Sequence, residues 1–233
     1  MVTLSVRILH ALLLVAFMLY GCNSDRTVFE NDSPTRSVVS LNDCSGSFRY
    51  AGEAYFINLE LLKTVRPCDY FCATFVTDSS IFSRPFHVAP AQVQTITEGT
   101  VFLSKRNEAS DSLKEAFDRC ISCTSKKTDF FNGITVASKI LHRQNSDIRI
   151  LAAFCDCNEN VSPRLVADLT GIHVIVFFAY QQDGDLSKYP EFASRIKQLF
   201  LDHNAAGVVV LSPAEATVFN VTEYINNPGG NHE

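Results

Sequence analysis

Residues 148–155 read IRILAAFC, and residues 172–180 read IHVIVFFAY. Both are short, nearly continuous apolar runs, and residues 69–77 (DYFCATFVT) and 207–211 (GVVVL) are of the same kind. Apolar runs of this length are typical of strands that are buried on both faces of a parallel sheet. We therefore expect these four segments to form the centre of a mostly parallel sheet.

Amphipathic segments lie between the apolar runs, at residues 107–122, 128–142 and 187–203. Their apolar residues recur at intervals of three and four, which predicts helices with one buried face. Strands that alternate with helices over this length predict an α/β fold, a three-layer sandwich with a mostly parallel central sheet. Residues 212–215 (SPAE) read as a capping box that opens the last helix, and residues 95–105 (TITEGTVFLSK) as a further strand.

The N-terminus has the layout of an export signal. One cation, Arg7, precedes an apolar run from Ile8 to Tyr20 that is too short to span a membrane comfortably. Residues 19–22 (LYGC) resemble the lipobox of bacterial lipoproteins, which implies cleavage after residue 21 and a diacylated Cys22. An ordinary cleaved signal and an uncleaved N-terminal anchor are the alternatives. By the same resemblance, Asn23 favours the periplasmic side of the outer membrane, so we expect a lipid-anchored protein of the cell envelope.

Composition suggests the organisation of the rest of the chain. Residues 22–47 are polar and lack periodicity, so they are expected to form a lipidated flexible tether. Residues 48–225 are expected to form the α/β domain and residues 226–233 a disordered tail. Removal of residues 1–21 leaves 19 basic and 25 acidic residues, a net charge of −6. With no basic cluster, nucleic acid is not expected as a partner.

Oxygen-bearing side chains follow the predicted strands. Asp78 and Ser80 come after the first apolar run, Asp156 ends the run at 148–155, and Thr128 opens a helix. In an open parallel sheet the carboxyl ends of the strands share one edge, which is where ligands bind. Two carboxylates and two hydroxyls at this edge predict a site for Mg²⁺ or another hard divalent cation.

These four residues, in this order, resemble the metal-ion-dependent adhesion site of von Willebrand factor A domains. There an Asp-x-Ser-x-Ser loop follows the first strand, and Asp78 and Ser80 match its first two positions. The resemblance implies a cation bound directly by the loop serines, partly through water by the aspartates, and completed by an acidic group of a protein partner. Phe82 stands at the position of the second loop serine, so a partly degenerate site is expected.

Cysteines lie beside these residues, at positions 120, 123, 155 and 157. In an exported chain we interpret Cys120, Cys123, Cys155 and Cys157 as disulfide-forming residues that staple the loops. Connectivity cannot be deduced from sequence. A zinc site and a redox-active Cys120–Cys123 pair are the alternatives.

A binding role is the leading hypothesis for the whole chain. We expect a membrane-anchored, non-enzymatic interaction domain of the von Willebrand factor A type. The first alternative is a periplasmic thiol–disulfide protein that uses Cys120 and Cys123. A hydrolase built from Asp78 and Asp156 is a weaker one, because no side chain in the sequence is a convincing base.

Overall fold

A computed structural model gives the fold. It describes residues 33–76, 82–91, 93, 96–122, 128–157, 164–179 and 186–229. The strands are β1 (Arg36–Asp43), β2 (Tyr70–Val76), β3 (Phe82–Val88), β4 (Ile148–Phe154), β5 (Ile172–Phe177) and β6 (Gly207–Val210). The helices are α2 (Ala51–Lys63), α3 (Ile96–Ile121), α4 (Phe130–His142), the 3₁₀ turn η1 (Leu186–Lys188), α5 (Tyr189–Leu201), α6 (Pro213–Val218) and α7 (Val221–Asn226).

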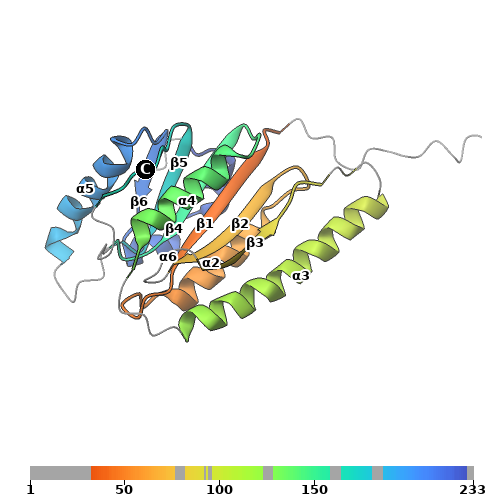
Figure 1. Ribbon diagram of the computed structural model, residues 1–233, viewed down its shortest axis with the longest axis horizontal. Helices are drawn as coiled ribbons and strands as arrows, with labels where there is room; N and C mark the ends of the chain where they lie inside the picture. Colours follow the sequence, from red (N-terminus) through yellow and green to blue (C-terminus); the bar gives the residue numbers. More distant parts are fainter. Residues whose placement is uncertain are drawn as a thin grey trace, which may run out of the picture.

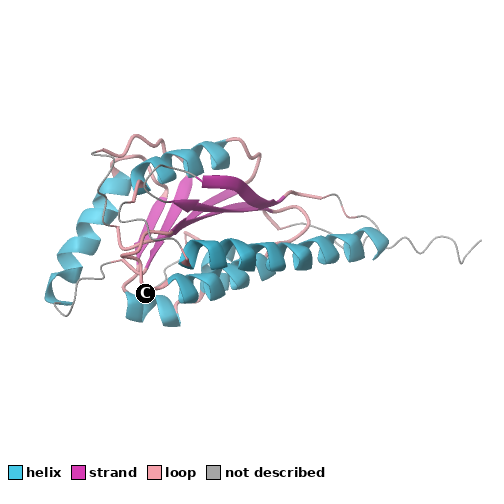
Figure 2. Cartoon of the chain, turned by 60° about the horizontal axis from the view of Figure 1, so that its bottom comes forward, coloured by secondary structure: helices cyan, strands magenta, loops and turns pink. Residues whose placement is uncertain are grey.

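The six strands form one sheet in the order β3-β2-β1-β4-β5-β6, in which only β3 runs antiparallel to its neighbour. Helices cover both faces (Figures 1 and 2). Apolar side chains of α4 and α5 pack on one face, and those of α2, α3, α6 and α7 pack on the other. The predicted three-layer sandwich with a mostly parallel sheet is confirmed, as are the strands expected at 148–155, 172–180 and 207–211, within a few residues at their ends.

The start of the domain differs from the prediction. Residues 36–43 were expected to belong to the tether, but they form β1, which pairs with β2 on one side and β4 on the other. All eight of its residues are buried, although five are polar or charged. The run at 69–77 therefore forms the second strand of the domain, β2, and not the first.

Most of the buried polar side chains of β1 have hydrogen-bond partners, and the hydroxyl of Ser37 is an exception among the described residues. Ser40 donates to Asn58 Oδ1 at 2.5 Å, and Asn58 Nδ2 donates to Asn42 Oδ1 at 3.0 Å. Asn42 also donates to the carbonyl oxygen of Thr74. A buried polar group is costly only when it lacks a hydrogen-bond partner, so this network allows a polar strand to lie at the centre of the sheet.

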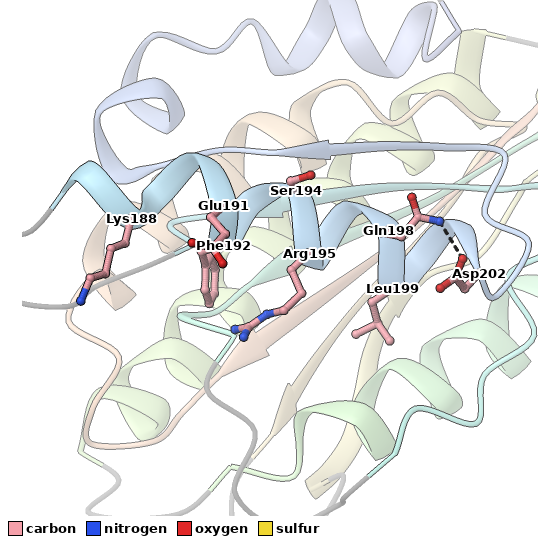
Figure 3. Close-up of a pocket in the computed structure, with 8 residues that line it drawn as sticks. All are labelled: Lys188, Glu191, Phe192, Ser194, Arg195, Gln198, Leu199 and Asp202. Atoms are coloured by element: carbon pink, nitrogen blue, oxygen red, sulfur yellow. Dashed lines mark hydrogen bonds between the residues drawn. The ribbon is translucent and has the colours of Figure 1, made fainter.

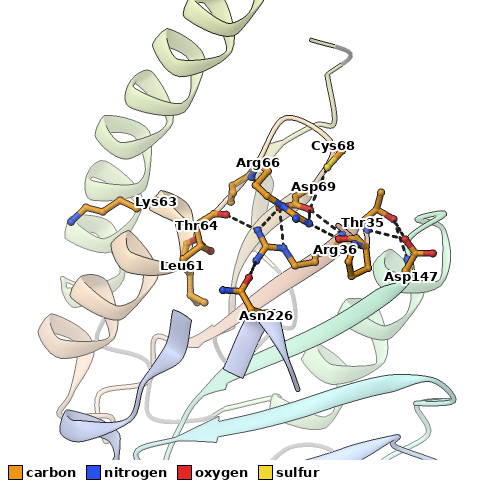
Figure 4. A network of polar contacts seen from close by, with 12 residues as sticks. Thr35, Arg36, Leu61, Lys63, Thr64, Arg66, Cys68, Asp69, Asp147 and Asn226 are labelled. Carbon is orange, nitrogen blue, oxygen red and sulfur yellow. Dashed lines mark hydrogen bonds and ion pairs between the residues drawn. The ribbon is translucent and has the colours of Figure 1, made fainter. Parts of the chain in front are cut away.

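An ion-pair network lies at the N-terminal end of β1 (Figure 4). Arg36 donates to Asp69 Oδ2 from two nitrogens, at 3.0 and 2.5 Å, and both side chains are buried. Arg36 Nη1 also donates to Asn226 Oδ1, and Nη2 to the carbonyl oxygen of Thr64. One guanidinium thus joins β1, β2, α2 and the C-terminal helix α7. Asn226, assigned to the tail by the sequence, is the last residue of that helix.

The structure also bears on the predictions for residues 95–105 and 212–215. Residues 95–105 were expected to form a strand, but from Ile96 onward they are the first turns of α3. The capping box at Ser212 and Glu215 is confirmed, but it opens α6, and α7 follows it. In the described part of the chain, no helix is both long and apolar enough to cross a membrane.

Candidate functional site

The loop after β1 carries the sequence Asp43-Cys44-Ser45-Gly46-Ser47, which has the Asp-x-Ser-x-Ser pattern with all three positions filled. Asp43 ends β1 and is buried. The backbone N–H of Ser45 donates to Asp43 Oδ1 at 2.7 Å, and the hydroxyls of Ser45 and Ser47 lie 2.9 Å apart. The loop therefore places Ser45 against the carboxylate of Asp43 and the hydroxyl of Ser47 against that of Ser45.

Thr128 reaches the same carboxylate from the start of α4. Its hydroxyl donates to Asp43, with distances of 3.3 Å to Oδ1 and 3.5 Å to Oδ2. The helix can approach this closely because Gly133 faces the sheet: a Cβ there would lie 2.7 Å from a methyl of Val76. The missing side chain thus lets α4 bring Thr128 to the end of β1.

Asp156, which follows β4, lies near the carboxylate of Asp43. Asn42 of β1 is level with Phe154, so Asp156 lies just beyond the point where Asp43 ends its own strand. Burial raises the pKa of Asp43 to about 6, and the negative charge of Asp156 adds to the effect, while hydrogen bonds from Ser45 and Thr128 oppose it. Two carboxylates that repel each other in a buried place are chemically suited to share a cation.

We call Asp43, Ser45, Ser47, Thr128 and Asp156 the Asp43 set. Its composition, two carboxylates and three hydroxyls, is an all-oxygen set suited to a hard divalent cation. In the described residues, no three or more His, Cys, Asp or Glu side chains form a cluster that could hold a metal, so hydroxyls are essential to any site here. The donor chemistry of the Asp43 set fits Mg²⁺.

The predicted site is therefore partly relocated. Thr128 donates to Asp43, and Asp156 lies close enough to Asp43 for its charge to act on that carboxyl. Asp78 and Ser80 lie outside the described residues, and they follow β2, whereas the first strand ends at Asp43. Phe82, read as a substitute for a loop serine, is the first residue of β3. The complete motif at 43–47 is the signal in the sequence for this site, but it lies within a stretch whose polar composition is typical of a tether.

The cysteines surround this set. Cys44, inside the loop, forms a disulfide with Cys120 at the end of α3. This confirms a disulfide beside the site but replaces the Cys120–Cys123 pair required by the redox alternative; Cys123 lies outside the described residues. Cys155 and Cys157, on either side of Asp156, are not in a disulfide, and their Sγ atoms lie 3.1 Å apart. Cys22 also lies outside the described residues.

Surface hollows lie elsewhere. One of about 850 Å³ runs along η1 and α5, with residues such as Glu191, Phe192 and Arg195 on its wall (Figure 3). A smaller, more apolar one of about 350 Å³ lies between α2, α6 and α7 and includes Phe177 and Phe178. Neither is lined by a member of the Asp43 set.

Comparisons with known proteins give a fold and no close relative. No protein-family model and no curated protein matches the chain. A von Willebrand factor type A protein from Catenulispora acidiphila has a solved structure that matches with a TM-score of 0.51 at 15% identity, over 83% of this chain and 42% of that one. The PilB minor pilin from Streptococcus sanguinis matches with a TM-score of 0.50 at 9% identity, over 86% and 63%.

This chain thus spans less than two thirds of the length of either of these two structures. At such low identity the likeness concerns the fold alone. The three-layer sandwich observed here is therefore similar in fold to the von Willebrand factor type A protein.

Proposed function

We propose that the chain binds a protein partner through a divalent cation, Mg²⁺ or a similar ion, held by the Asp43 set. The observation that carries the proposal is the meeting of Asp43, Ser45, Ser47, Thr128 and Asp156 from three separate segments at one edge of the sheet. A side chain that serves only in a turn or a helix cap forms its hydrogen bonds with residues near it in sequence, so it does not require groups from three segments.

The electrostatics of the set favour a bound cation. Asp43 is buried, and its pKa is raised to about 6, so the ionised form is held at a cost in the metal-free protein. A cation between the two carboxylates would offset both the desolvation and the repulsion. By the resemblance to von Willebrand factor A domains, Ser45 and Ser47 would bind the ion directly and the aspartates partly through water, while an acidic group of the partner would complete the shell.

The proposal assigns a binding role and no catalytic one. It also includes export: cleavage after residue 21, acylation of Cys22 and anchoring to a membrane of the cell envelope, with the periplasmic side of the outer membrane favoured. The domain begins at β1, so residues 22–35 would be the link between the lipid and the folded part. A displayed domain with a metal site on its edge is suited to capture a partner rather than to diffuse freely.

The test is Mg²⁺-dependent stability of the purified domain. We expect Mg²⁺ to raise the Tm of the wild-type protein, and the Asp43→Ala variant to lose this response. Asp111→Ala is the matched control, because it removes an exposed carboxylate of α3 and should leave the response unchanged. A ligand that binds only the native state increases the free energy of unfolding. At concentrations above Kd, this increase grows with the logarithm of the ligand concentration. An unchanged Tm of the wild type over millimolar Mg²⁺ would refute the metal site.

A further inference from the structure

Cys155 and Cys157 flank Asp156, and their sulfur atoms are in contact. The two Sγ atoms lie 3.1 Å apart, and both side chains pack in the part of the core that α4 covers. A disulfide requires a separation of about 2.05 Å, so a shift of about 1 Å would bring the two sulfurs to bonding distance. The two residues belong to a single segment that follows β4.

The backbone at this turn is already in an unusual conformation. Cys157 has a φ of +58°, in the left-handed region that residues other than glycine rarely adopt. In an extended strand, residues i and i+2 point to the same face but stay too far apart for their sulfurs to bond. The left-handed φ changes the direction of the Cys157 side chain relative to the preceding residues, and in this conformation its sulfur lies 3.1 Å from that of Cys155. The turn is therefore shaped for a bond between the two cysteines.

We propose that Cys155 and Cys157 form a reversible disulfide that clamps the Asp156 turn and increases the cation affinity of the Asp43 set. The second half of this inference rests on the proposed function. The Cys44–Cys120 disulfide lies in the neighbouring loop of the same set, so both loops that carry an aspartate would be held by sulfur. Cys157 is partly exposed, whereas Cys155 is fully buried, so Cys157 is the sulfur that an external reagent reaches first.

The chemistry is thiol–disulfide exchange with a disulfide R–S–S–R. Cys157 attacks one sulfur of the oxidant and forms a mixed disulfide, and the first R–SH leaves with one proton. Cys155 then attacks the Cys157 sulfur, forms the bond within the turn and releases the second R–SH with the other proton. The two cysteines lose two electrons, and the oxidant gains them.

The clamp would act on Asp156 because this residue lies inside the closed ring. In the open form the turn must be ordered when the ion binds, and ordering the backbone has an entropic cost. In the disulfide form the turn is already ordered before the ion binds, so the affinity for the cation increases. We expect the oxidised protein to bind Mg²⁺ about five- to tenfold more tightly, the factor expected when the backbone of one residue is ordered in advance.

The experiment uses the mature chain and a Cys155→Ser/Cys157→Ser double variant, both with Cys44–Cys120 intact. Each is treated with oxidised glutathione, alkylated and digested with trypsin, which releases residues 150–164 with both cysteines and no other. We expect this peptide to lose two hydrogens and to resist alkylation in the wild type. Calorimetric titration with Mg²⁺ should then show tighter binding by the oxidised wild type than by the double variant, with no effect of the oxidant on the variant.

Three other outcomes separate the two proposals. If the peptide keeps two free thiols after oxidation, the disulfide is refuted. If it forms but Mg²⁺ binds the wild type and the double variant equally, the clamp is refuted, while the metal site stands. If Mg²⁺ binds neither protein, the proposed metal-binding function fails, and the clamp with it.

Discussion

Asp43→Asn offers the sharpest test of the site, because it removes one titrating group and keeps its shape. The carboxyl of Asp43 has a pKa of about 6 in the folded protein against 3.8 for the ordinary group. Between these two values the native state holds a proton that the unfolded state has released. Stability contributed by this proton is fully present below pH 3.8, falls as the pH rises and is lost above about pH 6.

The magnitude follows from the same two values. Each tenfold change in a protonation equilibrium corresponds to about 1.4 kcal/mol, so the ionised Asp43 destabilises the metal-free protein by about 3 kcal/mol at neutral pH. The amide of Asp43→Asn has no charge to desolvate and can still accept the hydrogen bonds of Ser45 and Thr128. We therefore expect the variant to equal the wild type near pH 4 and to be about 3 kcal/mol more stable near pH 7.

Urea unfolding in the presence of a chelator measures this difference at a series of pH values. Other carboxyls titrate over the same range, so the difference between the two proteins is the informative quantity, and Asp111→Asn should give a flat line. Adding Mg²⁺ at pH 7 should stabilise the wild type and not Asp43→Asn. A difference that does not change between pH 4 and 7 would show that Asp43 is not a buried carboxyl with a raised pKa.

Three further substitutions test the packing and the anchor. Asp69→Ala leaves a buried guanidinium of β1 without its carboxylate and should cost about 3–5 kcal/mol in urea unfolding, whereas Glu60→Ala, which removes an exposed ion pair, should cost under about 1 kcal/mol. Gly133→Ala places a methyl 2.7 Å from β2 and should cost about 1–3 kcal/mol, whereas Gly52→Ala, with open space around it, should be neutral or stabilising. Cys22→Ser should abolish labelling by radioactive palmitate and release the protein from the membrane fraction; continued labelling would mean that another residue is acylated.

The centre of the fold was predictable because its strands are apolar without interruption. β4 and β5 lie between two helical layers, so both of their faces need apolar side chains. The uninterrupted apolar runs at residues 148–155 and 172–180 indicate this burial in the sequence itself. Residues 95–105 have the local composition of a strand, because threonine, valine and phenylalanine favour strands in isolation. There, packing of Phe102 against the core as part of a long helix overrode the local preference.

The central strand β1 escaped prediction for the opposite reason. Its sequence, RSVVSLND, has polar residues on both faces, which resembles a linker when the chain is read alone. Its polarity becomes compatible with burial only through partners that are distant in sequence: Asn58 from α2 for Ser40 and Asn42, and Asp69 for Arg36. A local pattern cannot reveal such partners, since each is supplied by the fold itself.

Only part of the candidate site could be predicted from the sequence, because one of its strands is polar. Thr128 and Asp156 adjoin elements that are legible in the sequence, so their place at the strand edge could be inferred. Asp43 follows a strand whose composition is typical of a tether, and this composition conceals the loop although all three of its positions match the family pattern. A complete loop motif is evidence for a strand in front of it, because the carboxylate serves a site only when a strand delivers it to the edge of the sheet. Residues 43–47 thus argue for β1 more strongly than the hydrophobicity of β1 does.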